Sequence, residues 1–308
     1  MSRCLVTGAS GFIGSHMVRY LINKKESPIA LVRYKAPERN YRLKHCWDFI
    51  PIMEADIRNR GAVLDAMKAC NPEYVFHFAA YNHVGQSFTQ SEECIGSNVL
   101  GTVNVVDAAH EVNPECRVVY ISSSEIYGAQ ERVPWDEGMA PSPQSPYAVS
   151  KYAGELYCSV RQEQGWPITI IRPFNVYGPG QSSKALIPEV INKALKGKII
   201  RTTEGKQTRE YTYVSDTVRG IYMAAKEEVL GPINIGSGNE MEIREIIRKI
   251  LKETGSKSRW ETDIPTRPNE IMRMKCSNEL ARSMIGWEPE VSFDDGLIKA
   301  IDSIRELM

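Results

Sequence analysis

The 308-residue chain lacks several features that would place it in a specialised class of proteins. It has 38 basic and 38 acidic residues, so it has no excess of positive charge for a nucleic-acid backbone. No apolar run approaches the roughly 20 residues of a membrane span. No two cysteines have the C-x-x-C spacing of many zinc sites. The sequence therefore predicts no nucleic-acid partner, no membrane partner and no metal site.

The cysteines and the first residues favour the cytoplasm. Seven scattered cysteines are an odd number and are expected to be reduced thiols. The segment MSRCLVTGASG leads directly into a strand-like run, without the apolar stretch of a signal peptide. The expected location is therefore cytoplasmic.

Short apolar runs alternate with helical patterns over residues 1–175. Helices are expected over 13–23, 61–70 and 91–111, between strands such as CLVTG, EYVFHFAA, CRVVYISSS and PITIIRPFN. Strands that are apolar throughout are buried on both faces, so the pattern predicts a Rossmann-type, doubly wound parallel α/β sheet. Residues 176–308 are expected to form a smaller, mixed α/β substrate region that is not independent.

Three glycines join the first expected strand to the first expected helix. TGASGFIG places Gly8, Gly11 and Gly14 three residues apart. At such a junction glycine permits a tight turn, a close approach of pyrophosphate to backbone, and close packing of helix on strand. The spacing G-x-x-G-x-x-G differs from the G-x-G-x-x-G motif. The prediction of a dinucleotide site therefore depends mainly on the position of the glycines between a strand and a helix.

The second strand ends in LVRYK, with Arg33 where an NAD site usually has an acidic residue. Arginine there can bind the 2'-phosphate, so NADP(H) is favoured and NAD(H) stays possible; the alternative is a solvated charge at a strand end. Asp56 could accept a hydrogen bond from the adenine amine, and Ala79 and Ala80 would let the backbone approach the cofactor. The other expected cofactor contacts are Phe12, Ile13, Ile57, Phe78, Tyr147, Lys151 and Pro173.

The spacing Tyr-x-x-x-Lys occurs three times. YLINK (20–24) and YMAAK (222–226) lie away from polar strand ends, whereas Tyr147 and Lys151 follow a strand that ends in ISSSEIYG. Ligands of open α/β sheets bind at such strand ends. Lys151 shares a helix face with Tyr147. With an oxidised nicotinamide, it would lower the tyrosine pKa from about 10, so that Tyr147 accepts a proton while a nearby serine holds the substrate hydroxyl.

Together the motifs resemble a known family. Beyond Gly8 to Gly14 and Asp56, the chain contains FAAYNHV, NVLGTVNVVDAA, SSSEIYG, SPYAVSK, RPFNVYGPGQ and REYTYVSD, in that order. This set resembles the extended short-chain dehydrogenase/reductases that modify nucleotide-activated sugars, over essentially the whole chain. The resemblance implies a cofactor domain over 1–175, a nucleotide-sugar domain over 176–308 and an active site between them. It also implies a homodimer formed by two helices of the first domain.

The resemblance assigns roles to the strand end before Tyr147. Ser123 matches the active-site serine or threonine, and Ser124 and Glu125 occupy the positions at which subfamilies differ. A carboxylate at the second position is typical of 4,6-dehydratases and nucleotide-glucuronate decarboxylases, and some 4-keto-6-deoxymannose reductases also have it. The 4-epimerases usually have small residues there. Glu125 would remove the C5 proton while water leaves C6; otherwise it is a solvated strand-end carboxylate.

The resemblance also implies residues that bind the substrate. Arginines would hold the diphosphate through bidentate, permanently charged pairing. Gly180 replaces an arginine found in several dehydratases and decarboxylases, which favours a reductase-like pattern in this loop. His83 could face a ligand or be an ordinary loop histidine. The expected substrate contacts, besides His83, are Asn175, Gln181, Lys184, Arg209 and Arg267.

The favoured function is a nucleotide-hexose 4,6-dehydratase that oxidises C4 transiently and produces a 4-keto-6-deoxy sugar. An NADPH-dependent 4-keto-6-deoxy-sugar reductase is the first alternative, and a 4-epimerase is the second. A non-catalytic dinucleotide-binding scaffold is the remote alternative. It is disfavoured because Ser123, Tyr147 and Lys151 are all present.

Overall fold

A parallel sheet forms the centre of the computed structural model, which describes residues 1–35, 37–266 and 270–308. Within these residues the sheet has seven strands in the order β11-β6-β5-β4-β1-β2-β3, and every neighbouring pair is parallel. The predicted doubly wound parallel α/β sheet is therefore confirmed. The strands are β1 (Arg3–Thr7), β2 (Ser27–Val32), β3 (Ile52–Glu54), β4 (Tyr74–His77), β5 (Arg117–Ile121), β6 (Ile168–Pro173) and β11 (Pro232–Ile235).

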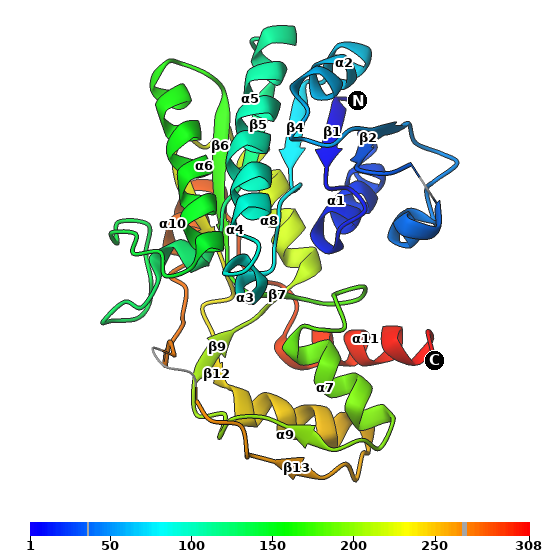
Figure 1. The fold of residues 1–308 in the computed structure, drawn as a ribbon, viewed down its shortest axis with the longest axis vertical. Helices are drawn as coiled ribbons and strands as arrows, with labels where there is room; N and C mark the ends of the chain where they lie inside the picture. The colour runs from blue at the N-terminus through cyan, green and yellow to red at the C-terminus, as the bar shows by residue number, and fades with distance from the viewer. Residues whose placement is uncertain (36, 267–269) are drawn as a thin grey trace.

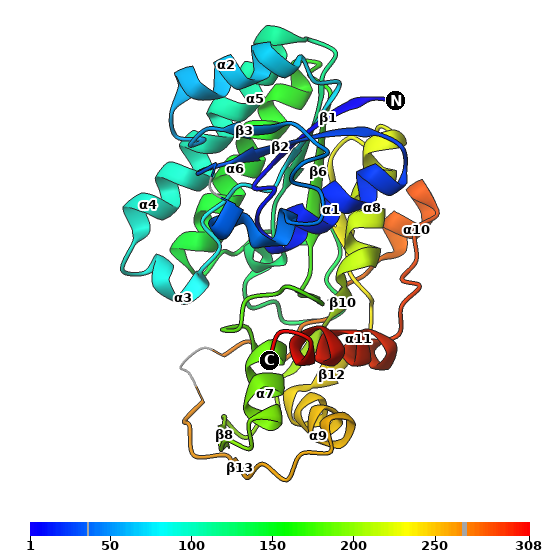
Figure 2. The same ribbon diagram turned by 90° about the vertical axis from the view of Figure 1, so that its right-hand side faces the viewer.

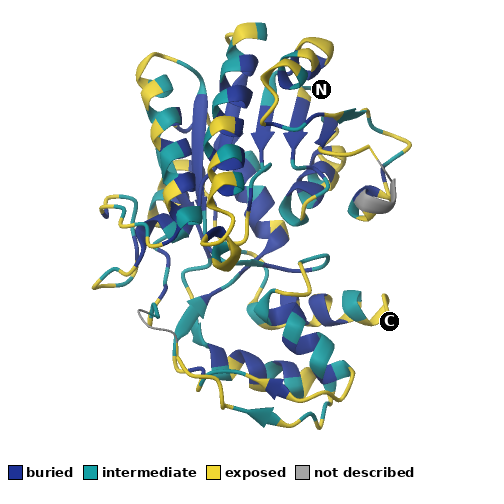
Figure 3. Cartoon of the chain, viewed as in Figure 1, coloured by how far each residue is buried: buried dark blue, intermediate teal, exposed yellow. Residues whose placement is uncertain are grey.

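Helices cover both faces of this sheet (Figures 1 and 2). Two separate apolar clusters bind them to it, one on each face. The strands between are buried (Figure 3), which explains why their sequences are continuously apolar rather than alternating. On one face lie α1 (Phe12–Asn23), α8 (Val214–Lys226) and α10 (Glu279–Ile285), and on the other α2 (Arg60–Cys70), α5 (Gly101–Val112) and α6 (Pro146–Glu163).

The helix expected over 91–111 is not uniform. It consists of α4 (Ser91–Ile95), a π-helical turn η2 (Gly96–Leu100) and α5. Asn98 in the π turn accepts a hydrogen bond from Tyr81 N at 2.7 Å and donates one to Tyr81 O at 3.0 Å. Such turns are frequent at functional sites, and this one fixes the segment that follows β4.

A smaller lobe lies beyond the carboxyl ends of the strands (Figure 2). Three helices pack around an isoleucine-rich core, which the periodic isoleucines of α9 help to form. The helices are α7 (Leu186–Leu195), α9 (Ile243–Thr254) and α11 (Phe293–Arg305). The strand pairs are β7 (Val176–Tyr177) with β10 (Thr212–Tyr213), β9 (Thr208–Glu210) with β12 (Glu240–Glu242), and β8 (Ile200–Arg201) with β13 (Trp260–Glu261).

The two halves of the chain are interleaved. The strand β11 and the helices α8 and α10 follow residue 175 in sequence, yet they complete the main sheet and cover one of its faces. Residue 175 therefore does not separate two structural units. The division into a cofactor domain over 1–175 and a substrate domain over 176–308 stays a prediction about function.

The described residues hold no helix long and apolar enough to cross a membrane, and no three His, Cys, Asp or Glu side chains placed to share a metal ion. All seven cysteines are buried free thiols.

Candidate active site

The glycine loop lies where the strand order reverses, between β1 and β4 at the carboxyl edge of the sheet. Gly8 has a φ of +64°, and a Cβ there would come within 2.7 Å of Ala79 N. A Cβ on Gly14 would collide with the carbonyl oxygen of Gly8. The backbone therefore leaves no room for a side chain at position 8, in the turn of the loop, or at position 14, in the first turn of α1. The open cradle, next to a helix N-terminus, fits the pyrophosphate of a dinucleotide.

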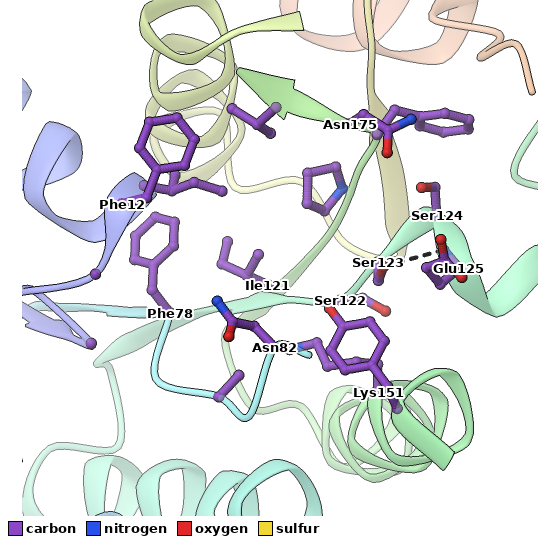
Figure 4. Close-up of a pocket in the computed structure, with 18 of the residues that line it drawn as sticks. Phe12, Phe78, Asn82, Ile121, Ser122, Ser123, Ser124, Glu125, Lys151 and Asn175 are labelled. Carbon is purple, nitrogen blue, oxygen red and sulfur yellow. Dashed lines mark hydrogen bonds between the residues drawn. The ribbon is translucent and has the colours of Figure 1, made fainter. Parts of the chain in front are cut away.

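A cavity of about 320 Å³ extends from this loop to the start of α6 (Figure 4). Phe12 and Phe78 lie at one end, and the strand-end residues 123–125 at the other. The cavity brings together residues expected to bind cofactor and residues expected to act on substrate, and their roles remain predictions. Those that line it are Gly8, Gly11, Phe12, Ile13, Gly14, Phe78, Ala80, Ser123, Ser124, Glu125, Tyr147, Lys151, Pro173 and Asn175.

A second cavity, of about 220 Å³, shares Gly8 and Phe78 with the first and continues to the ends of β2 and β3. Four of the residues expected to contact the cofactor line it, namely Arg33, Asp56, Ile57 and Ala79, and their contacts with it remain predictions.

Asp56 has a charged partner within the protein, and its expected hydrogen bond to the adenine amine stays a prediction. Arg58 Nη2 donates to its Oδ2 at 2.6 Å, and Arg58 Nε donates to its Oδ1 at 3.0 Å. These bonds lower the pKa of Asp56 to about 2. Asp56 is therefore ionised, and its carboxylate is shared with an arginine that the sequence did not indicate.

Tyr147 and Lys151 occupy the first turns of α6. The helix begins there because Ser145 Oγ accepts a hydrogen bond from Ala148 N and Pro146 occupies the first helical position. Burial raises the pKa of Tyr147 to about 12, although a hydrogen bond with the Ser123 hydroxyl opposes this rise. Burial also lowers the pKa of Lys151 to about 8. The phenol is thus protonated at neutral pH, and lowering its pKa requires the added positive charge of an oxidised cofactor.

The other two Tyr-x-x-x-Lys pairs lie elsewhere. The rings of Tyr20 and Tyr222 are 5.4 Å apart between α1 and α8, and Tyr222 donates to Glu26 Oε1. Identical spacing therefore gives three different environments.

Glu125 lies on the 3₁₀ turn η3 (Ser124–Tyr127) that follows β5. Ser123 Oγ accepts a hydrogen bond from Glu125 N at 3.1 Å, which caps this turn (Figure 4). Burial raises the pKa of the Glu125 carboxyl, the charge of Arg209 opposes the rise, and that of Glu270 adds to it. Glu125 is a partly buried carboxyl at the cavity, rather than a solvated one.

The expected substrate residues are more dispersed. His83, Gln181 and Lys184 line a third cavity, of about 580 Å³, together with Phe12. Arg209 lines a different cavity, of about 280 Å³, and donates to Glu270 Oε1 at 2.5 Å and to Ile271 O at 2.6 Å. Arg267 lies outside the described residues.

Sequence reasoning missed two features of the site. Asn82 lines the first, second and third cavities; its signal was a polar residue soon after the end of β4. The loop around Gly180 is held by Arg42, whose Nε donates to Gly180 O at 2.7 Å. His16 contacts Pro179 O at 2.8 Å. These contacts join segments far apart in sequence, so no local pattern could indicate them.

The sequence is similar to a known protein family and to several of its members. The model of the NAD dependent epimerase/dehydratase family matches residues 4–236. The chain is 33% identical to the dTDP-D-glucose 4,6-dehydratase of Bos taurus, over 99% of this chain and 89% of the relative. It is also 33% identical to the UDP-N-acetyl-alpha-D-glucosaminuronate decarboxylase of Bacillus cytotoxicus, over 99% and 98%.

A solved structure extends the likeness to the fold. The dTDP-glucose 4,6-dehydratase DesIV of Streptomyces venezuelae, determined with NAD bound, superposes with a TM-score of 0.88 at 29% identity, covering 99% of this chain and 97% of the other. The cradle of glycines and the parallel sheet are consistent with that likeness. The chain therefore belongs to the NAD-dependent epimerase/dehydratase family, among the extended short-chain dehydrogenase/reductases.

Proposed function

We propose that the protein is a nucleotide-hexose 4,6-dehydratase. One observation carries the proposal: the partly buried Glu125 carboxyl lines the same cavity as Ser123, Tyr147 and Lys151. Oxidation or reduction at C4 needs only the last three residues, whereas loss of water across C5 and C6 needs a further acid/base group. The relatives named as 4,6-dehydratases, including DesIV, support the same reaction.

The first part of the reaction falls to the start of α6. A nicotinamide dinucleotide bound along the glycine cradle would accept a hydride from C4 of the sugar and, after water has left, return it to C6 while C5 regains a proton. The Ser123 hydroxyl holds the C4 hydroxyl of the sugar, and Tyr147 removes its proton. The Lys151 ammonium stabilises the resulting phenolate.

Glu125 performs the second part. Oxidation at C4 makes the proton on C5 acidic, and the Glu125 carboxylate removes it. The protonated carboxyl then gives this proton to the C6 hydroxyl, which leaves as water. Because burial raises its pKa, Glu125 is a better proton acceptor than a solvated glutamate and can act as base and then acid.

Mass spectrometry over a panel of nucleotide hexoses tests this function. The wild-type protein is expected to remove one water from at least one of them, with no net consumption of cofactor. A Glu125→Gln variant should still oxidise C4 but lose water about 10²-fold more slowly. The exposed Glu131, in the loop that follows, provides a matched Glu131→Gln control.

The same panel separates the alternatives. Stoichiometric oxidation of NADPH by a 4-keto-6-deoxy sugar, without loss of water, would replace the dehydratase by the reductase. Conversion of a sugar to an isomer of equal mass would indicate the 4-epimerase. Absence of any reaction with every sugar would leave the non-catalytic scaffold.

For the cofactor we propose a preference for NADP(H). Arg33 lines the second cavity together with Ser10, and its guanidinium lies 3.8 Å from the carboxylates of Asp56 and Glu93. A 2'-phosphate there would gain a charge-assisted contact. Arg33→Ala should therefore weaken NADPH binding about 10-fold in a fluorescence titration and leave NADH binding unchanged. Lys35→Ala is the control, and equal weakening of both cofactors would contradict the preference.

We also propose a homodimer, as expected from the resemblance. Exposed apolar side chains lie on α4, η2 and α6, which contact one another. They are Ile95, Leu100, Val149, Leu156 and Val160, each about half exposed. Light scattering is expected to give twice the chain mass, and Val160→Glu should give a monomer.

The seven free thiols favour a reducing compartment such as the cytoplasm.

A further inference from the structure

A buried ion pair lies behind the catalytic segment. Glu155 on α6 and Arg172 on β6 are each 4% exposed. Arg172 Nη2 donates to Glu155 Oε1 at 2.5 Å, and Arg172 Nε donates to the same oxygen at 3.2 Å. Buried charges are stable only when they are paired and their remaining hydrogen-bonding sites are satisfied. The other hydrogen-bond partners of Glu155 and Arg172 therefore show which part of the chain the ion pair positions.

Two of those partners are the ends of one short segment, and a third, the carbonyl oxygen of Glu137, accepts a longer hydrogen bond from Arg172 Nη1 at 3.4 Å. Ser122 Oγ donates to Glu155 Oε2 at 2.5 Å, and Arg172 Nη1 donates to the Tyr127 hydroxyl at 2.8 Å. Tyr127 in turn donates to Asn234 Oδ1 at 2.8 Å. The residues between these anchors are Ser123 and Glu125 with their neighbours Ser124 and Ile126.

The segment needs such anchors because its own hydrogen bonds are few. It leaves the sheet after β5 and forms the four-residue 3₁₀ turn η3, a helix type with poor hydrogen-bond geometry. Glu155 stands one helical turn beyond Lys151 and two beyond Tyr147 on α6, so these three side chains share one helix face. The ion pair thus links the position of the segment to the helix that carries the acid/base tyrosine.

We propose that Glu155 and Arg172 are positioning residues: their ion pair fixes both ends of Ser122–Tyr127 and so sets Ser123 and Glu125 against Tyr147. The Ser122 end controls the position of the hydroxyl that holds the substrate. The Tyr127 end controls the position of the carboxyl that acts at C5. This separation of the two ends rests on the dehydratase function proposed above.

Removing either charge would leave its partner buried and unpaired, and the protein could fail to fold. Ser122→Ala and Tyr127→Phe instead release one anchor each and leave the ion pair in place. In the holoenzyme with a reactive nucleotide hexose, Ser122→Ala should slow formation of the reduced nicotinamide, seen by its absorbance, about 10-fold or more. Tyr127→Phe should form it at the wild-type rate but accumulate it, because elimination is slowed. KM should change in neither variant.

Tyr157→Phe is the matched control. It removes a tyrosine hydroxyl from the same helix, bonded to Asp107 and Arg161, which do not contact the segment. This variant should behave as wild type. Wild-type kinetics in both Ser122→Ala and Tyr127→Phe would overturn the proposal, whereas a wild type that removes water from no sugar would overturn the proposed function instead.

Amide hydrogen exchange provides a readout that needs no turnover. Residues 122–127 of the holoenzyme should exchange faster in Ser122→Ala and in Tyr127→Phe than in the wild type or in Tyr157→Phe. Unchanged exchange in both anchor variants would refute the positioning role, whatever the reaction proves to be.

Discussion

The two regions of the site are organised differently. At the carboxyl edge of the sheet, the glycine loop, the strand ends and the first turns of α6 meet around one cavity. In the smaller lobe, the expected substrate residues are divided among cavities: Gln181 and Lys184 line one, and Arg209 lines another. Asn175, just beyond β6, lines the first cavity instead.

The difference follows from what holds each region. The strand ends are fixed by ladders of backbone hydrogen bonds and by buried helices, so groups that perform chemistry are placed before any ligand binds. The smaller lobe presents its residues from loops and strands of two or three residues. Arg209 already has a carboxylate partner in Glu270, which a diphosphate would have to replace. If Arg209 binds the diphosphate as expected, it has to exchange one charged partner for another.

The largest effect is expected from a substitution at the carboxyl edge of the sheet. Tyr147→Phe removes the expected proton acceptor with little change of shape, so kcat should fall about 10³-fold, far more than cofactor affinity. Steady-state turnover and a fluorescence titration with NADPH measure the two quantities. Tyr222→Phe removes a hydroxyl with the same Tyr-x-x-x-Lys spacing and should keep wild-type turnover. If Tyr147→Phe also turned over at the wild-type rate, the catalytic assignment would be wrong.

An intermediate effect is expected in the smaller lobe. If Arg209 binds the diphosphate as expected, Arg209→Gln removes a charged contact, so KM should rise about 10-fold to 100-fold with little change in kcat. Glu270→Gln should lower KM, because the diphosphate no longer displaces a carboxylate. Initial rates over a range of nucleotide-sugar concentrations give both values.

Arg273→Gln is the control for this pair of variants. Arg273 also pairs with a glutamate of the same lobe, Glu240, but is largely exposed. Its KM should equal that of wild type. A fall in kcat rather than a rise in KM for Arg209→Gln would show that both regions act on the chemical step.

The sequence predicted the parts of the site that are formed by continuous segments, and it did not predict the contacts between distant segments. The glycine loop and the α6 start are local signals, because each is continuous in sequence: Gly8 to Gly14 follows β1, and Ser145 to Lys151 begins α6. The long-range pairs gave no such signal. Glu155 with Arg172, 17 residues apart, and Arg209 with Glu270, 61 apart, meet only after the sheet and lobes assemble. The π turn within the helix after β4 was equally invisible, since its hydrogen bonds to Tyr81 are tertiary.

His77 in the sheet and Glu210 in the smaller lobe are buried titratable groups that change stability with pH in opposite directions. In the sheet, burial lowers the pKa of His77 to about 3, and its ring nitrogens contact the hydroxyls of Thr7 and Thr102. Between pH 3 and about 6.5 only the unfolded histidine binds a proton, so stability rises with pH over this window. In the smaller lobe, burial raises the pKa of Glu210 to about 7, although backbone N–H groups, that of Cys276 first, oppose the rise.

The last prediction concerns stability rather than activity and tests this contrast through Glu210→Gln. Between its unfolded pKa of about 4.3 and its folded pKa of about 7, only the folded glutamate keeps its proton, so it lowers stability as pH rises, by at most about 1.4 kcal/mol per pH unit. The free energy of unfolding of the variant, minus that of wild type, should therefore rise from about pH 4.3 to 7 and then stay level in denaturant titrations. Glu240→Gln, its cross-strand neighbour, should show no such slope, because Arg273 lowers the pKa of Glu240. Parallel curves for Glu210→Gln and wild type would mean that Glu210 is ionised in the folded protein throughout this range, and the two regions would then not respond to pH in opposite directions.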